Sequence, residues 1–260
     1  MSHSACITAD APEHKPVIGN KMYHCTSTIA VDSVQKTYGF DVLLEYSENF
    51  FSWKKSNFTI NGKTSFEKAD RLYLHLTSPL NTIELGCKEG KVTALYQKKE
   101  ITKEWERTKA KLQSEYSGKV AEQLIEAYDR HYSSPGKLIQ FLQADGVFQL
   151  FYRGFLNNHL VYQGFSSGIQ HQLFGFSGVE PITILGNKTL QMEGTDLKLQ
   201  YLATTQNTKD DPLDITVDDN FILDPKSTWI KKATATIHNK TNNSRTTITL
   251  KSKQPWRRTR

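Results

Sequence analysis

The spacing of apolar residues changes twice along this chain, and this limits the folds open to it. Between residues 21 and 99 apolar side chains recur at every second position, as in Phe40, Val42 and Leu44, which is the spacing of half-buried strands. From Thr102 the spacing becomes helical, and beyond Val147 the alternation returns. One apolar sheet face and one apolar helical stripe must bury each other. The pattern therefore predicts an α+β, mainly β fold: an extended or curved antiparallel sheet with a central helical segment packed on one face.

Turn-forming residues divide the strand-like regions. Asn61-Gly62 is typical of a tight turn, and the alternating Leu72, Leu74 and Leu76 predict a strand after it. On the far side of the helical segment, the apolar run from Phe148 to Phe155 predicts the first strand of a second β-rich region.

The helical segment carries one apolar stripe and one expected break. Its stripe consists of Trp105, Leu112, Tyr116, Val120, Leu124 and Tyr128. Ser117-Gly118 lies within this stripe, and because glycine is unfavourable inside a helix we expect a kink or break there. A further helix is predicted to begin with Ser134 as its cap and Pro135 in its first position, and to end at Gly146.

The chain of 260 residues is long enough to bury a sizeable core. We expect one α+β domain over residues 17–251, preceded by a flexible leader (1–16) and followed by a basic tail (252–260). Within the domain we expect three parts: β-rich 21–99, helical 102–143 and β-rich 147–251.

Charge and cysteine content exclude several classes of protein. The formal charge is +6, but acidic residues are interleaved with the basic ones, so nucleic-acid binding is not favoured. No run of 18 apolar residues is present to span a membrane. Three scattered cysteines suit a reducing compartment, so we expect a cytoplasmic protein if the chain is complete. If a leader ending before Cys6 was removed, a periplasmic protein or lipoprotein is the alternative.

No catalytic, cofactor or metal motif stands out. The Gly-rich run from Gly164 to Gly178 is typical of bulged strands, although it is also the best candidate for a functional surface. The spacing of His159 and His171 matches no metal motif. A group of acidic residues is interpreted as a polar loop: Asp210, Asp211, Asp214, Asp218 and Asp219. We therefore expect no cofactor and no metal, and an enzyme, for which only His171 and its loop could be nominated, is a less favoured alternative.

A second alternative is a carrier of a hydrophobic ligand. If the sheet curls around the helices, aromatic side chains could line an apolar groove, and such a curved sheet with a helical lid resembles the bacterial lipoprotein-carrier fold. The candidate ligand-binding residues are Phe148, Phe151, Phe155, Phe165, His171 and Phe174.

Two segments carry a resemblance to known proteins. Residues 90–132, which contain "EITKEW" and a central glycine, resemble a strand-to-helix pattern of β-rich Bacteroidota proteins of unknown function. Residues 221–237, "FILDPKSTWIKKATATI", resemble the closing hairpin of such proteins. The resemblance covers under a quarter of the chain and implies no catalytic residue. It favours an accessory protein of the kind associated with secretion or toxin loci.

The favoured interpretation is thus a non-catalytic protein-interaction module, such as an adaptor, a chaperone or a structural accessory of a larger bacterial assembly. An open antiparallel sheet offers unpaired backbone groups at its edge, where a protein partner could add a strand. The last strand is the candidate edge, with Arg245, Thr247 and Thr249 as its interaction residues. The oligomeric state is left open.

Overall fold

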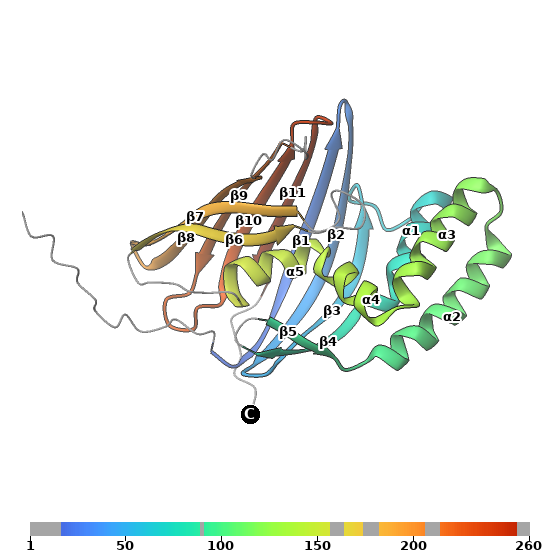
Figure 1. Ribbon diagram of the computed structural model, residues 1–260, viewed down its shortest axis with the longest axis horizontal. Helices are drawn as coiled ribbons and strands as arrows, with labels where there is room; N and C mark the ends of the chain where they lie inside the picture. Colours follow the sequence, from blue (N-terminus) through green and yellow to red (C-terminus); the bar gives the residue numbers. More distant parts are fainter. Residues whose placement is uncertain (1–16, 89–90, 157–163, 174–181, 206–213, 254–260) are drawn as a thin grey trace, which may run out of the picture.

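The computed structural model describes residues 17–88, 91–156, 164–173, 182–205 and 214–253 (Figure 1). Its strands form one antiparallel sheet in the order β5-β4-β3-β2-β1-β11-β10-β9-β8-β7-β6. They are β1 (Gly19–Val31), β2 (Val34–Ser47), β3 (Phe50–Ile60), β4 (Thr82–Lys88), β5 (Lys91–Leu95), β6 (Gly164–Leu173), β7 (Ile182–Glu193), β8 (Asp196–Thr205), β9 (Ile215–Leu223), β10 (Ile230–Asn239) and β11 (Ser244–Ser252). The predicted leader and most of the predicted basic tail lie outside the described residues.

The sheet consists of two meanders joined at the middle. Strands β1 to β5 pair in sequence order, as do β6 to β11, and β1 pairs with β11. The predicted edge is therefore wrong: Arg245, Thr247 and Thr249 lie in β11, which is bonded to β1 on one side and β10 on the other. Order along the chain does not reveal that the first and last strands are neighbours. The sheet edges are β5 and β6.

In the sequence, the helices are inserted between strands of the sheet. They are α1 (Lys68–Thr77) and the 3₁₀-helix η1 (Ser78–Leu80) before β4, and α2 (Lys98–Glu115), α3 (Lys119–Tyr132), α4 (Pro135–Gln143), α5 (Gly146–Phe151) and the π-helix η2 (Tyr152–Leu156) between β5 and β6. Because β5 and β6 are opposite edges, the second group crosses one face of the sheet, with α5 over its middle (Figure 1). The predicted fold class is confirmed. Among the described helices, none is both long and apolar enough to cross a membrane.

The alternation of period two is confirmed in the central strands. In β1 and β2 the side chains of Tyr23, Cys25, Val42 and Leu44 all point into the core and are fully buried. In β7, Gly186 lies within one continuous strand.

The strand predicted at Leu72, Leu74 and Leu76 is wrong, because these residues form α1. Leu72 and Leu76 are four residues apart and therefore share one helical face, on which both are buried. Over five residues, a spacing of two and a spacing of four cannot be told apart when every second residue is leucine.

The strand predicted from Phe148 to Phe155 is also wrong, as is the helix end predicted at Gly146. Gly146 begins α5, with Asp145 as the cap, accepting hydrogen bonds from the backbone N–H groups of Val147 (3.0 Å) and Phe148 (3.2 Å). Every residue from Val147 to Phe151 is buried. A short helix that is buried on all sides has no polar face, so its sequence has no helical period.

Two glycines let this segment lie directly against the sheet. A Cβ atom at Gly146 would come within 2.5 Å of Ile248 in β11, and one at Gly154 within 2.2 Å of Phe221 in β9. Phe151 packs against Tyr23 of β1 with ring centroids 5.5 Å apart, and Phe148 packs against Trp53 of β3 at 6.1 Å. The segment from α5 to η2 thus contacts strands of both meanders.

The break predicted at Ser117-Gly118 is confirmed: α2 ends at Glu115 and α3 begins at Lys119, with Gly118 at φ +103°. The break changes the phase of the apolar stripe. Val120 and Leu124 are therefore exposed (72% and 40%), and Ile125 is buried instead.

Candidate functional site

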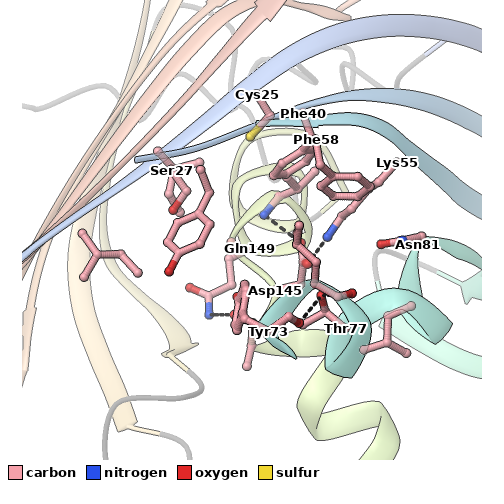
Figure 2. Close-up of a pocket in the computed structure, with 18 of the residues that line it drawn as sticks. Cys25, Ser27, Phe40, Lys55, Phe58, Tyr73, Thr77, Asn81, Asp145 and Gln149 are labelled. Atoms are coloured by element: carbon pink, nitrogen blue, oxygen red, sulfur yellow. Dashed lines mark hydrogen bonds and ion pairs between the residues drawn. The ribbon is translucent and has the colours of Figure 1, made fainter. Parts of the chain in front are cut away.

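A cavity of about 290 Å³ lies between the helix-covered face of the sheet and the helices (Figure 2). Its sheet wall is formed by β1, β2, β3, β10 and β11, and its helical wall by α1, η1, α3, α4 and the start of α5. Hydrogen bonds fix the end of η1 on the sheet: Trp53 Nε1 donates to the carbonyl of Leu80 (3.0 Å), and the Lys55 N–H donates to that of Asn81 (2.7 Å). The walls are therefore attached to one another beside the cavity.

Most of the lining is apolar. Phe40 and Phe58 pack against each other with ring centroids 5.7 Å apart. The apolar lining residues are Cys25, Ile29, Phe40, Phe58, Leu74, Leu80, Phe141, Ala144, Val147, Ile237 and Ile248. Ile29 and Tyr73 are 40% and 42% exposed, so the cavity reaches the surface between β1 and α1.

A bulge in β3 brings one charged side chain into this apolar wall. The register of β2 with β3 shifts beside Asn57, which has φ +54°. As a result both Lys55 and Phe58, three residues apart, line the cavity, whereas regular alternation would place them on opposite faces.

Lys55 forms an ion pair with Asp145 across the cavity, as Figure 2 shows. The two side chains are 10% and 23% exposed. The Lys55 Nζ also lies 5.2 Å from the centroid of the Phe40 ring, a cation–π contact. Because Asp145 caps α5 through its other oxygen, the pair connects β3 to the start of that helix.

Three tyrosines from three elements also face the cavity: Tyr38 of β2, Tyr73 of α1 and Tyr128 of α3. The rings of Tyr38 and Tyr73 lie 5.3 Å apart. Burial raises the pKa of Tyr128 to about 12, and burial together with the nearby Tyr128 and Tyr38 raises the pKa of Tyr73 well above its usual range. All three phenols are consequently protonated at neutral pH and can donate hydrogen bonds.

The predicted ligand-binding residues do not line this cavity. Phe148 and Phe151 are buried in the core (2% and 0% exposed), Phe165 on β6 is 66% exposed, and His171 on β6 is buried. Phe155 lies in η2 without a described side chain, and Phe174 and His159 lie outside the described residues. The cavity residues come from segments far apart in sequence, and no signal in the sequence singles them out.

His171 lies instead beside a buried ionic network that the sequence did not predict. Arg153 binds Asp219 through two hydrogen bonds (2.5 and 3.2 Å), and their side chains are 1% and 0% exposed. Lys188 donates to the Arg153 carbonyl (2.9 Å), and burial lowers its pKa to about 8. Burial, with Lys188 and Arg153 nearby, lowers the pKa of His171 to about 3, so its imidazole is neutral.

The interpretation of the acidic group as a polar loop is wrong for Asp218 and Asp219; Asp214 precedes the strand, and Asp210 and Asp211 lie outside the described residues. Asp218 and Asp219 lie in β9, where Ile215, Val217 and Phe221 alternate inward with Asp219. Because the buried Asp219 takes an inward position that an apolar residue would normally occupy, the sequence pattern of this strand resembles a polar loop. Within the described residues, no three His, Cys, Asp or Glu side chains are placed to hold a metal ion.

Comparisons with known proteins assign this chain to no family. No family model and no curated protein matches it. A lipovitellin structure, described by its lipid–protein interactions, aligns with a TM-score of 0.49 at 12% identity over 93% of this chain and 26% of its own. The chain thus spans about a quarter of that protein. A domain named as an outer membrane lipoprotein-sorting protein, from Vibrio parahaemolyticus, aligns with a TM-score of 0.26 at 8% identity, covering 92% of this chain and 86% of that one.

Proposed function

We propose that the protein binds a small, largely apolar molecule in the cavity between the sheet and its helices. The observation that carries this proposal is the cavity itself, about 290 Å³ with aromatic and aliphatic walls. Protein interiors contain few voids larger than one water molecule, which takes about 30 Å³ of the liquid. Apolar concave sites with a few polar groups are the usual form of ligand pockets.

The size of the cavity restricts the ligand. Its volume lies at the lower end of the roughly 300–1,000 Å³ that ligand pockets occupy. One small molecule or one short hydrocarbon chain fits, whereas several long chains would need the helices to move away from the sheet. In this proposal the ligand enters between β1 and α1, beside the partly exposed Ile29 and Tyr73.

Two variants on one strand test the proposal. Ser27 lines the cavity, and Thr28, the next residue, points to the opposite face of the sheet, where its hydroxyl bonds Thr37 (3.0 Å). Ser27→Phe would fill part of the cavity, and Thr28→Phe adds the same ring outside it. We expect Ser27→Phe to weaken binding of the uncharged apolar dye N-phenyl-1-naphthylamine at least tenfold and Thr28→Phe to change it less than twofold.

Native mass spectrometry of the protein purified from its host would complete the test. A bound apolar molecule of one defined mass, absent from Ser27→Phe and present in Thr28→Phe, supports the proposal. If the dye binds neither the unaltered chain nor Thr28→Phe, or if Ser27→Phe binds it as well as the unaltered chain does, the cavity is not the site.

The other functional predictions from the sequence stay predictions. A protein-interaction module loses its candidate edge, because β11 is an interior strand. For an enzyme, the nominated His171 lies among Tyr152 and Tyr201, with ring centroids 6.0 and 4.9 Å away, and is not part of the cavity wall. Neither reading gains an observation comparable to the cavity. A cytoplasmic location likewise stays a prediction.

A further inference from the structure

Polar side chains line several parts of the cavity wall, and three of them, all tyrosines, lie close together. Tyr38, Tyr73 and Tyr128 approach one another from the sheet and from two helices, at the side where Tyr73 reaches the surface. Tyr128 is held by Phe141, against which it packs edge to face with ring centroids 5.2 Å apart. None of the three hydroxyls forms a hydrogen bond with the described part of the chain. The cavity therefore has a mostly apolar wall and a group of three tyrosine hydroxyl donors at one side.

The charges of the cavity wall cancel. Among the described lining residues the charged side chains are Lys55 and Asp145, which form an ion pair with each other. Beside Tyr38, the Lys36 ammonium is likewise paired with Asp70. An anionic ligand group would thus lose its water without meeting an unpaired cation, and a cationic group would not meet an unpaired carboxylate. Burying a charge without a partner is strongly unfavourable.

We infer that the ligand is an amphiphile whose polar end is uncharged and accepts hydrogen bonds, such as a hydroxyl or a carbonyl group, and that the three tyrosines bind this end. The inference rests on the proposed function, since it concerns the same cavity. The phenol groups supply the hydrogen-bond donors, and the apolar side chains of the wall, such as Phe40 and Ile248, contact the hydrocarbon part of the ligand. Fatty-acid anions and simple alkanes of the same length are therefore the weaker ligands.

The experiment compares octane, 1-octanol and octanoate as competitors of N-phenyl-1-naphthylamine at pH 7. We expect 1-octanol to bind about 3- to 10-fold more tightly than octane, the range that one net hydrogen bond provides. Octanoate should bind more weakly than 1-octanol. Tyr73→Phe and Tyr128→Phe should each remove most of the preference for 1-octanol over octane and leave octane binding within about twofold.

Tyr96→Phe is the matched control. Tyr96 is 59% exposed and stacks on Phe50, away from the cavity, so the preference should be unchanged. Circular dichroism confirms that each variant is folded. The inference is wrong if octanoate is the tightest of the three ligands, or if Tyr73→Phe and Tyr128→Phe both keep the preference for 1-octanol over octane. In either case, binding of the dye would still support the proposed function. A bound dye that none of the three competitors displaces would likewise overturn the inference. If the unaltered protein binds neither the dye nor octane, the proposed function itself is wrong.

Discussion

Replacing Asp219 by alanine should destabilise the fold more than most single changes, because it leaves the Arg153 guanidinium buried without its carboxylate. The two side chains are 1% and 0% exposed and share two hydrogen bonds. Removing one partner of such a pair costs about 3–5 kcal/mol, out of a total stability of roughly 5–15 kcal/mol. Lys188 lies close enough for its pKa to respond to both groups, so the variant also removes the carboxylate that favours the charged form of Lys188.

The double variant Arg153→Met/Asp219→Leu separates the pair from the packing around it. Removing both charges avoids the uncompensated cation, so it should cost about 2 kcal/mol or less. The Lys188 bond goes to the backbone carbonyl of Arg153 and survives the change, whereas the bond that the Arg153 Nη1–H donates to Gln149 Oε1 (3.0 Å) is lost. A double-mutant cycle should therefore give a coupling energy of about 2 kcal/mol or more.

Urea unfolding, followed by the fluorescence of the buried Trp53, Trp105 and Trp229, measures these differences. A single transition with an unchanged slope is needed for each variant, because only then does the midpoint report stability. The reasoning fails if Asp219→Ala costs less than about 1 kcal/mol, or if the double variant is as unstable as the single one. The first result would mean that the pair is not isolated from water, and the second that the loss of stability comes from packing and not from the unpaired charge.

Three further predictions follow from individual contacts. Gly154→Ala should cost about 1–3 kcal/mol, because its Cβ would lie 2.2 Å from Phe221, whereas Gly136→Ala, which meets nothing within 4 Å, should be neutral or slightly stabilising in the same urea assay. Burial opposes ionisation of Asp41, but hydrogen bonds from Asn57, Lys253 and His24 lower its pKa to about 2. The stability that the ionised Asp41 adds is therefore present above about pH 4 and is lost as the pH falls towards 2. Because Lys253 and His24 are nearly half exposed, this contribution should be only about 1 kcal/mol and should vanish from the acid titration of Asp41→Asn. Burial lowers the pKa of Lys188, so as the pH rises the folded state releases this proton before the unfolded state does. Stability should therefore rise between about pH 8 and 9.5, by at most about 1.4 kcal/mol per pH unit, and Lys188→Met should remove this rise.

The parts of the fold that could be predicted from the sequence are those whose neighbours are local. The spacing of apolar residues in β1 and β2 and the helix break at Gly118 depend on residues within a few positions, and both predictions are confirmed. The errors have a common cause, which is burial on more than one side. In α5 it removes the helical period, and in β9 the buried Asp219 imitates a loop.

The cavity could not have been predicted in this way. Its charged pair joins residues 90 positions apart, and its tyrosines belong to three elements that only the folded sheet brings together. The Phe residues predicted to bind a ligand lie within one stretch of the chain, between Phe148 and Phe174. Two of them, Phe148 and Phe151, are used to attach α5 to the sheet, and that attachment is what places Asp145 beside the cavity.

The pairing of β1 with β11 has a consequence for the order of folding. Each meander is made of hairpins between successive strands, which can close over short loops, whereas the hydrogen bond between Thr26 and Thr249 joins residues 223 positions apart. Closing so long a loop is costly in entropy and slow, since folding rates fall as contacts become less local. We therefore expect the two meanders to form first and their junction last. The segment from α5 to η2, which touches both, can draw them together only once each presents its strands, so a slow phase should report the burial of Phe151 against Tyr23 and of Gly154 against Phe221.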